Sequence, residues 1–324
     1  MKRRVLGQSD LVVSRLALGT STWGATTDKE DAAKQIIEFI DAGGNLVDTA
    51  DIYAGGKSEH ILGQLLGTVV PRSSVVLATK AAGVLGAGPP FRHNASRAHL
   101  QAALDASLRR LGTDHVDLWQ MHAWDPHTPL DATLSAIDTA ISTGRVRHAG
   151  VSNYSGWQTA KAATSQIKHG QAPLVSIEVE YSLLERGIER EVVPAALDFG
   201  IGILPWAPLG RGVLTGKYRG GVPAERENSR FFKWYVGARL FQDRTAGIVE
   251  SVAAAARETG TSPLAVALAW VRDRPSVVAP VVGARMVEQL RESLQAEDFE
   301  LPDDVRHQLD EVSAPYVGYP ETGI

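Results

Sequence analysis

Short runs of apolar residues alternate along the chain with longer stretches in which apolar positions recur at helical spacing. Continuous apolar runs are typical of parallel strands that are buried on both faces. Eight strands are predicted, at residues 16–19, 45–47, 75–78, 116–121, 146–151, 174–179, 202–205 and 277–282. Every strand is followed by a predicted helix or helix pair, at residues 28–42, 58–66, 96–111, 130–142, 156–168, 191–199, 244–258 with 263–273, and 287–295, and a closing helix spans 302–312.

Strand–helix alternation is compatible with a doubly wound sheet or with a barrel. The eight predicted strands and the length of 324 residues favour an α/β fold of the (β/α)8 barrel type. A β-hairpin is predicted before the first barrel strand, with its turn at residues 7–10. The irregular stretch from Ala207 to about Gln242 follows the seventh strand and is long enough to predict a functional loop. No linker interrupts the pattern, so residues 1–324 are interpreted as one barrel domain.

Composition narrows the class of partner. The net charge of −4 predicts no basic face for nucleic acid. The absence of cysteine excludes disulfides, thiolate catalysis and cysteine zinc sites. No apolar window is long enough to span a membrane. The basic start at residues 1–4 is followed by polar residues 7–10 and not by the apolar run of a signal peptide, so a cytoplasmic location is predicted. The sequence leaves the oligomeric state open.

Polar residues follow the second to fifth predicted strands, where a barrel carries its active site. Each has an ordinary structural alternative, since an Asp often forms a turn and a Lys is often solvated. Together, at the ends of successive strands, they predict one site. These residues are Asp48 and Tyr53, Lys80, His122, and Ser152 with Asn153.

This set of side chains suits carbonyl reduction. The substrate oxygen gains negative charge as hydride arrives and needs a proton and a hydrogen-bond donor. The Tyr53 hydroxyl is the candidate proton donor. Its unperturbed pKa is about 10, and a Lys80 ammonium held by Asp48 is expected to lower the pKa of Tyr53. His122 is the candidate that orients the carbonyl. Lys80 as the Schiff-base lysine of a barrel aldolase is an alternative, whereas His122 and His127 lack a third metal ligand nearby, so no metal is predicted.

Four ordered motifs carry a family resemblance. They are GGNLVDTADIY at residues 43–53, LATK at 77–80, DHVDLWQMH at 114–122 and GVSNY at 150–154. The chain resembles the aldo-keto reductase superfamily over essentially its whole length. The resemblance implies a catalytic tetrad of Asp48, Tyr53, Lys80 and His122 with Tyr53 as general acid. It also implies that the opening hairpin closes the bottom of the barrel.

The cofactor site is expected at the carboxyl ends of strands seven and eight. No Gly-x-Gly-x-x-Gly follows the first strand, so a Rossmann site is unsupported. A barrel binds phosphate after strands seven and eight, where Gly283 permits close backbone approach and Arg285 offers a bidentate contact. The resemblance implies NADPH/NADP+ as cofactor, because Arg285 matches a 2′-phosphate ligand.

The resemblance also assigns the remaining cofactor contacts. Ser152, Asn153 and Trp206 are expected at the nicotinamide. Glu178 stands where many members carry a Gln that contacts the carboxamide, and Ser293 where they often carry Asn. The pyrophosphate clamp is expected from Leu209, Gly210, Gly212, Lys217 and Arg230, and the adenosine end from Gly283, Arg285, Gln289 and Ser293.

Aromatic residues are expected to wall the substrate pocket. Trp23 and Trp124 are the first candidates, joined by Phe231, Phe232, Trp234 and Tyr235 of the long loop and by Tyr316 and Tyr319. Such walls suit a moderately apolar aldehyde or ketone, or the corresponding alcohol in the reverse direction. The sequence identifies neither the substrate nor the direction. A regulatory subunit that binds NADPH and turns over slowly is a further alternative.

Overall fold

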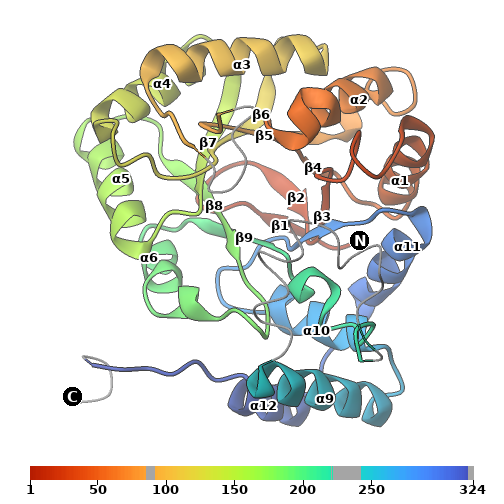
Figure 1. Ribbon diagram of the computed structural model, residues 1–324. Coiled ribbons are helices and arrows are strands. Elements are labelled where there is room, and N and C mark those ends of the chain that lie inside the picture. Colours follow the sequence, from red (N-terminus) through yellow and green to blue (C-terminus); the bar gives the residue numbers. More distant parts are fainter. Residues whose placement is uncertain (85–91, 220, 222–241, 320–324) are drawn as a thin grey trace.

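Eight parallel strands form a ring that is surrounded by helices (Figure 1). The computed structural model describes residues 1–84, 92–219, 221 and 242–319. In the sheet the strand order is β10-β3-β4-β5-β6-β7-β8-β9. The strands are β3 (Ala17–Gly19), β4 (Leu46–Asp48), β5 (Val76–Ala81), β6 (Val116–Met121), β7 (Val146–Ser152), β8 (Leu174–Glu180), β9 (Gly202–Trp206) and β10 (Val281–Gly283). The predicted (β/α)8 barrel is therefore confirmed.

The helices lie close to their predicted positions. They are α1 (Lys29–Asp41), α2 (Lys57–Leu65), α3 (Arg97–Leu111), α4 (Leu130–Ser142), α5 (Gly156–Lys168), α6 (Val192–Asp198), α9 (Asp243–Glu258), α10 (Pro263–Arg272), α11 (Val287–Gln295) and α12 (Asp303–Val312). Capping side chains fix several starts: Asp28 accepts from the Asp31 N–H, and Ser155 forms a capping box with Gln158. Gly112 ends α3 in the left-handed conformation that glycine adopts readily. Within the described part of the chain, no helix is long and apolar enough to cross a membrane.

The ring is closed between its first and last strands. Ala17 of β3 pairs with Val281 of β10, and an isolated parallel bridge joins Ile203 of β9 to Val277. The eighth strand was predicted at residues 277–282, but the regular strand is confined to Val281–Gly283. The physical reason is Pro280, which has no N–H to extend the ladder.

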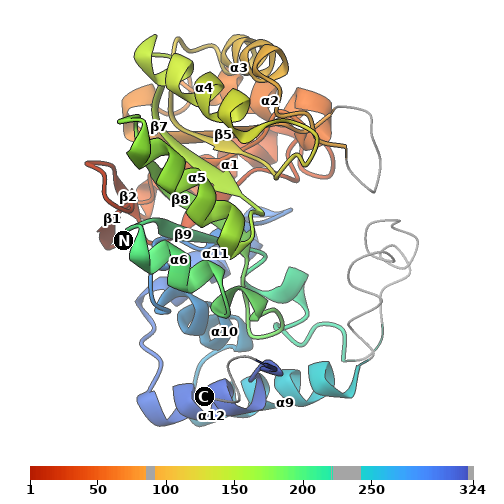
Figure 2. The same ribbon diagram turned by 90° about the vertical axis from the view of Figure 1, so that its left-hand side faces the viewer.

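An antiparallel hairpin of β1 (Arg3–Val5) and β2 (Val12–Ser14) precedes the barrel. Leu6 and Val13 are fully buried in a core cluster with residues from the barrel strands and from the segment just before β10. These partners are Ala17, Leu46, Ala78, Leu118, Val175, Leu204, Val278, Ala279 and Val281. Figure 2 shows the hairpin at one end of the barrel. The hairpin thus covers the amino ends of the strands and leaves the carboxyl ends for the loops.

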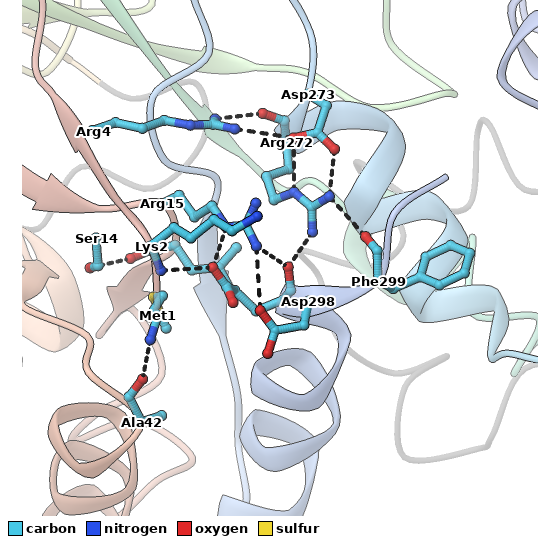
Figure 3. A network of polar contacts seen from close by, with 12 residues as sticks. Met1, Lys2, Arg4, Ser14, Arg15, Ala42, Arg272, Asp273, Asp298 and Phe299 are labelled. Carbon is cyan, nitrogen blue, oxygen red and sulfur yellow. Dashed lines mark hydrogen bonds and ion pairs between the residues drawn. The ribbon is translucent and has the colours of Figure 1, made fainter. Parts of the chain in front are cut away.

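A buried polar network joins this hairpin end to the C-terminal part of the chain (Figure 3). The Arg15 guanidinium forms an ion pair with Glu297, and both side chains are almost fully buried. Arg272 donates to the Phe299 carbonyl and pairs with Asp273, which also pairs with Arg4. Buried charges are stable only when they are paired and hydrogen-bonded. The network therefore fixes the amino end of the barrel.

Candidate active site

Three of the predicted catalytic side chains meet directly. The Lys80 ammonium lies 2.5 Å from Asp48 Oδ2 and 3.2 Å from the Tyr53 hydroxyl. It also donates to the Thr49 carbonyl at 3.2 Å. The His122 ring stands edge-on to the Tyr53 ring, with centroids 5.9 Å apart. Residues from β4, β5 and the turns after β4 and β6 are thus gathered at one point.

Sheet register explains this meeting. Asp48 is the last residue of β4, and Lys80 lies inside β5, one residue before its end. The sequence placed both just beyond their strands. The strand β5 is longer than predicted because Lys80 and Ala81 pair with Gln120 and Met121 of β6. The His122 N–H then donates to the Ala81 carbonyl at 2.7 Å, which holds the histidine at the same level.

Tyr53 opens a short 3-10 turn, η1 (Tyr53–Gly56), in which Ala54 has a φ of 49°. Other non-glycine residues with positive φ follow strands of the barrel, among them Ala82, Asn153 and Ala207. Such conformations cost on the order of 1–3 kcal/mol each and cluster at functional sites. Their positions mark the carboxyl rim of the barrel as the functional end.

Glu178 joins the catalytic cluster. Its Oε1 lies 3.2 Å from the Lys80 ammonium, and its Oε2 accepts from Gln120 Nε2 at 2.9 Å. Gln120 in turn accepts from the Ser176 hydroxyl at 3.0 Å. The family resemblance predicts that residue 178 contacts the nicotinamide carboxamide. In the structure, both carboxylate oxygens of Glu178 contact side chains of the protein itself. The sequence signal for this contact with Lys80 is a charged residue, Glu178, inside the otherwise mostly apolar strand β8.

Burial governs the protonation of the cluster. It raises the pKa of Asp48 well above its usual range, and the neighbouring Glu178 charge adds to this effect. Burial alone would lower the pKa of Lys80, but the Asp48 and Glu178 carboxyl groups outweigh it and raise that pKa. Lys80 is therefore held as an ammonium.

The Tyr53 phenol behaves differently from the expectation. Burial raises its pKa above the ordinary value, and the Lys80 ammonium only opposes this rise. The sequence predicts a lowered pKa of Tyr53 from the Lys80 ammonium, but the loss of water and the charges of Asp48 and Glu178 outweigh that ammonium. Burial and the Lys80 charge lower the pKa of His122 to about 3, so its imidazole is neutral near pH 7. A neutral imidazole carries one N–H donor.

Asn153 connects several of the predicted nicotinamide contacts. Its side-chain amide donates to the His122 carbonyl and to Ser152 Oγ, each at 3.0 Å. Its side-chain oxygen accepts from the Trp206 indole N–H at 3.0 Å. The structure therefore brings Ser152, Asn153 and Trp206 together beside His122.

A short turn after β9 carries the predicted pyrophosphate contacts. Leu209 precedes the 3-10 turn η4 (Gly210–Gly212), and its carbonyl accepts from the Gly212 N–H at 2.9 Å. The Lys217 ammonium lies so close to Gly212 that a Cβ there would meet it at 2.2 Å. Arg211 lies over the Trp206 ring, 5.2 Å from its centroid. Leu209, Gly210, Gly212 and Lys217 are thus grouped as predicted, while Arg230 lies outside the described residues.

The predicted adenosine contacts lie at β10 and α11. Gly283 is exposed, and a Cβ there would have the Gly19 carbonyl as its nearest neighbour at 3.7 Å. The Arg285 N–H donates to Gln289 Oε1, and the Ser293 hydroxyl donates to the Gln289 carbonyl. The Arg285 guanidinium has no hydrogen bond or ion pair within residues 1–84, 92–219, 221 and 242–319.

The aromatic residues predicted for the substrate pocket separate into groups. Trp124 packs edge-on against Tyr154 and Trp157, with centroids 5.2 and 5.4 Å apart. Trp23, in contrast, is fully buried in the main core, and its indole N–H donates to Gln35. The Trp23 side chain therefore packs in the core beside Gln35 of α1, and its predicted role in the pocket wall stays a prediction. Tyr316 and Tyr319 are 97% and 86% exposed, and Phe231, Phe232, Trp234 and Tyr235 lie outside the described residues.

Comparisons with known proteins agree with this geometry. A sequence profile of the Aldo/keto reductase family matches residues 15–314. An uncharacterized oxidoreductase of Bacillus subtilis, YrpG, is 36% identical over 320 residues, covering 96% of each chain. A versiconal hemiacetal acetate reductase of Aspergillus parasiticus is 30% identical, covering 96% of each chain. A probable voltage-gated potassium channel subunit beta of Oryza sativa is 33% identical, covering 92% of each chain.

Proposed function

The chain belongs to the aldo/keto reductase family of oxidoreductases, and from this premise we propose that it is an NADP-dependent reductase of aldehydes or ketones. The observation that carries the proposal is the contact of Lys80 with Tyr53, 3.2 Å apart, beside His122. It supplies a proton donor and a hydrogen-bond donor for one substrate oxygen.

Each side chain has a role in this reaction. Tyr53 donates its proton to the carbonyl oxygen as that oxygen becomes an alkoxide. The Lys80 ammonium, 5.1 Å from the Tyr53 ring centroid, stabilises the phenolate that remains. Neutral His122 donates a hydrogen bond to the same oxygen, and Asp48 holds Lys80 in place.

The residues present fit NADPH, which supplies the hydride when bound. The Arg285 guanidinium makes no interaction within the described residues, so it is available for a 2′-phosphate. Exposed Gly283 leaves the backbone open to a phosphate next to it. The Trp206 ring, fixed by Asn153, offers a flat face for the nicotinamide. Trp124, with Tyr154 and Trp157, offers an apolar wall for the substrate.

The Schiff-base alternative fits poorly. An amine nucleophile must lose its proton, usually in an apolar pocket or beside another cation. Lys80 instead contacts two carboxyl groups, which raise its pKa. The regulatory alternative has specific support, because a relative from Oryza sativa is described as a potassium channel subunit beta. We keep it as the second candidate.

Titration with NADPH and with NADH, followed by tryptophan fluorescence, tests the cofactor. Turnover of 4-nitrobenzaldehyde, followed by nicotinamide absorbance, tests the reaction. We expect tighter binding of NADPH and a loss of kcat of at least about a hundredfold in Tyr53→Phe, since proton donation is lost. Unchanged NADPH affinity in this variant is the control for folding.

The other outcomes discriminate between the candidates. Tight NADPH binding with negligible turnover of a broad aldehyde panel favours the regulatory role. Failure to bind either nucleotide overturns the reductase, and borohydride trapping of Lys80 by a carbonyl compound would then favour the aldolase.

A further inference from the structure

Glu178 is a buried acid that reaches the catalytic lysine from the far side of the barrel. Its strand, β8, stands four places from β4 in the ring, so Glu178 and Asp48 come from opposite strands. Glu178 Oε1 and Asp48 Oδ2 lie 3.2 and 2.5 Å from the same Lys80 ammonium. We propose that Glu178 is a positioning residue that, together with Asp48, forms a carboxyl pair sharing one proton around Lys80.

The donors of Lys80 are fully used. An ammonium has three N–H donors, and Asp48, the Thr49 carbonyl and the Tyr53 hydroxyl accept three hydrogen bonds. Glu178 Oε1 is therefore a fourth oxygen close to the Lys80 ammonium. The Glu178 carboxylate is attracted by the charge and held by Gln120, which fixes its second oxygen at 2.9 Å. This arrangement makes Lys80 rigid while its contact with Tyr53 is kept.

The charge count requires a shared proton. Two carboxylates and one ammonium would leave a net negative charge among side chains that are 4% exposed or less. Isolated buried charge is costly, and close carboxyl groups avoid it by retaining a proton. Asp48 Oδ1 is buried without a hydrogen-bond partner among the described residues, which is unfavourable for an anionic oxygen. Burial and the charge of Glu178 raise the pKa of Asp48 accordingly.

The groups that face this pair come from every neighbouring element. They are Lys80 from β5, Gln120 from β6, and Tyr53 and His122 from the turns after β4 and β6. His122 is neutral because burial lowers its pKa to about 3. Burial raises the pKa of Asp51 to about 7, and the Lys80 charge opposes this rise. Among the described residues, Asp48 and Glu178 are the carboxyl groups that form ion pairs with Lys80.

A consequence for catalysis follows, and it rests on the proposed reductase function. When Tyr53 gives its proton to the substrate oxygen, the phenolate is stabilised by Lys80. If the carboxyl pair loses its shared proton at high pH, the added negative charge opposes phenolate formation. The rate of reduction should therefore fall as the pair titrates. Removing Glu178 leaves one carboxylate with one ammonium, which needs no shared proton.

The experiment compares the wild type with Glu178→Gln, Glu178→Asp and the control Glu258→Gln, which lies exposed at the end of α9. The pH profile of kcat for 4-nitrobenzaldehyde reduction is measured together with NADPH affinity. We expect Glu178→Gln to keep its NADPH affinity within about threefold. Its kcat should no longer show the fall at high pH that accompanies loss of the shared proton. Glu178→Asp should lower kcat but retain this fall, since it keeps the acid. Glu258→Gln should behave like the wild type.

A stability measurement makes the test independent of turnover. An acid whose pKa is raised in the folded state contributes stability that is present below its unfolded pKa of about 4 and is lost as pH rises through the folded pKa. The melting temperature of the wild type should therefore fall with rising pH more steeply than that of Glu178→Gln. If Glu178→Gln does not fold, Asp48→Asn should flatten the same dependence, because it removes the other partner.

The outcomes are distinct. Identical pH profiles and melting curves for wild type and Glu178→Gln would overturn the shared proton. A large loss of NADPH affinity with an unchanged pH profile would overturn the positioning role in favour of a nicotinamide contact. If the wild type reduces no carbonyl, the proposed function fails, and the melting curves alone decide on the carboxyl pair.

Discussion

The indole N–H of Trp206 donates to the side-chain oxygen of Asn153 across 3.0 Å, joining the end of β9 to the turn after β7. The same Asn153 amide donates to the His122 carbonyl. One side chain therefore couples the ring expected under the nicotinamide to the backbone of His122, the proposed donor to the substrate oxygen. Its backbone φ of 55° is unusual for a residue other than glycine.

Two substitutions of Asn153 separate the effect of its side-chain hydrogen bonds from the effect of its positive φ. Asn153→Ala should weaken NADPH binding on the order of tenfold, because three hydrogen bonds worth about 1 kcal/mol each are lost near the ring and only part of that loss falls on binding. Asn153→Gly loses the same bonds but adopts φ of 55° without strain. We expect equal NADPH affinities for the two variants by fluorescence titration, and a lower unfolding midpoint for Ala. Wild-type affinity in either variant would contradict the coupling.

The guanidinium of Arg285, which has no hydrogen bond or ion pair with any described residue, predicts the choice between NADPH and NADH. Arg285→Ala should weaken NADPH binding by about ten- to a hundredfold, the range for a lost charge-assisted contact, and leave NADH binding unchanged. Arg291→Ala is the matched control, since Arg291 lies on α11, the helix that begins just after Arg285, but pairs with Glu38. Parallel titrations of the three proteins measure the ratio of the two affinities. Equal losses for NADPH and NADH would show that Arg285 does not contact the 2′-phosphate.

Asp51 predicts a loss of stability near neutral pH. Burial and the Glu59 charge raise its pKa to about 7, while the value in the unfolded chain is about 3.9. The folded state therefore binds the proton more tightly, and this stabilisation, roughly 4 kcal/mol, is lost as pH rises through about 7. Asp51→Asn should be less sensitive to pH between 5 and 9 in urea unfolding. A slope equal to that of the wild type would exclude an effect of Asp51.

The ion pair of Arg15 and Glu297 predicts the opposite dependence. Burial alone would raise the pKa of Glu297, but the Arg15 hydrogen bond and charge outweigh it and lower that pKa. The stabilisation is thus present above the unfolded pKa of about 4.3 and is lost as pH falls through the folded value. Glu297→Gln should cost about 2 kcal/mol at pH 7, less than the full loss of a buried charge partner because carbonyl contacts remain.

Urea unfolding at pH 7 and at pH 4 measures this effect. Glu300→Gln is the control, because Glu300 is 82% exposed and only approaches Lys2 at the surface. The difference between wild type and Glu297→Gln should shrink at the lower pH. A difference that is independent of pH would indicate lost packing rather than lost charge.

Much of this architecture could be predicted because local patterns and the fold agree. The predicted boundaries of α4, α5 and α11 coincide with those observed, and a capping box of Ser155 and Gln158 marks the start of α5. The meeting of Asp48, Tyr53, Lys80 and His122 was also predictable, because residues at the ends of neighbouring parallel strands lie close together. Strand ends were less predictable, as Lys80 shows, because register depends on a partner strand.

The remaining differences come from contacts between distant residues. Glu178 contacts Lys80 only because the closed ring brings β8 and β5, which are not neighbouring strands, to face each other across its interior. Trp23 is buried by its packing and its bond to Gln35, which no local pattern reports. The raised pKa of Tyr53 likewise depends on burial, which a sequence does not reveal. In all three cases, residues distant in the sequence determine the surroundings of the side chain.

The pairing of Ala17 with Val281 has a consequence for synthesis on the ribosome. Because chains are synthesised from the N-terminus, β3 is made well before β10, its partner strand, which follows α10 in the sequence. Until then β3 exposes one row of unpaired N–H and C=O groups, an edge on which another nascent chain can add a strand. We therefore expect slow or stalled translation after α10 to promote aggregation, because the polypeptide made by then lacks β10, the strand that pairs with β3, together with α11 and α12.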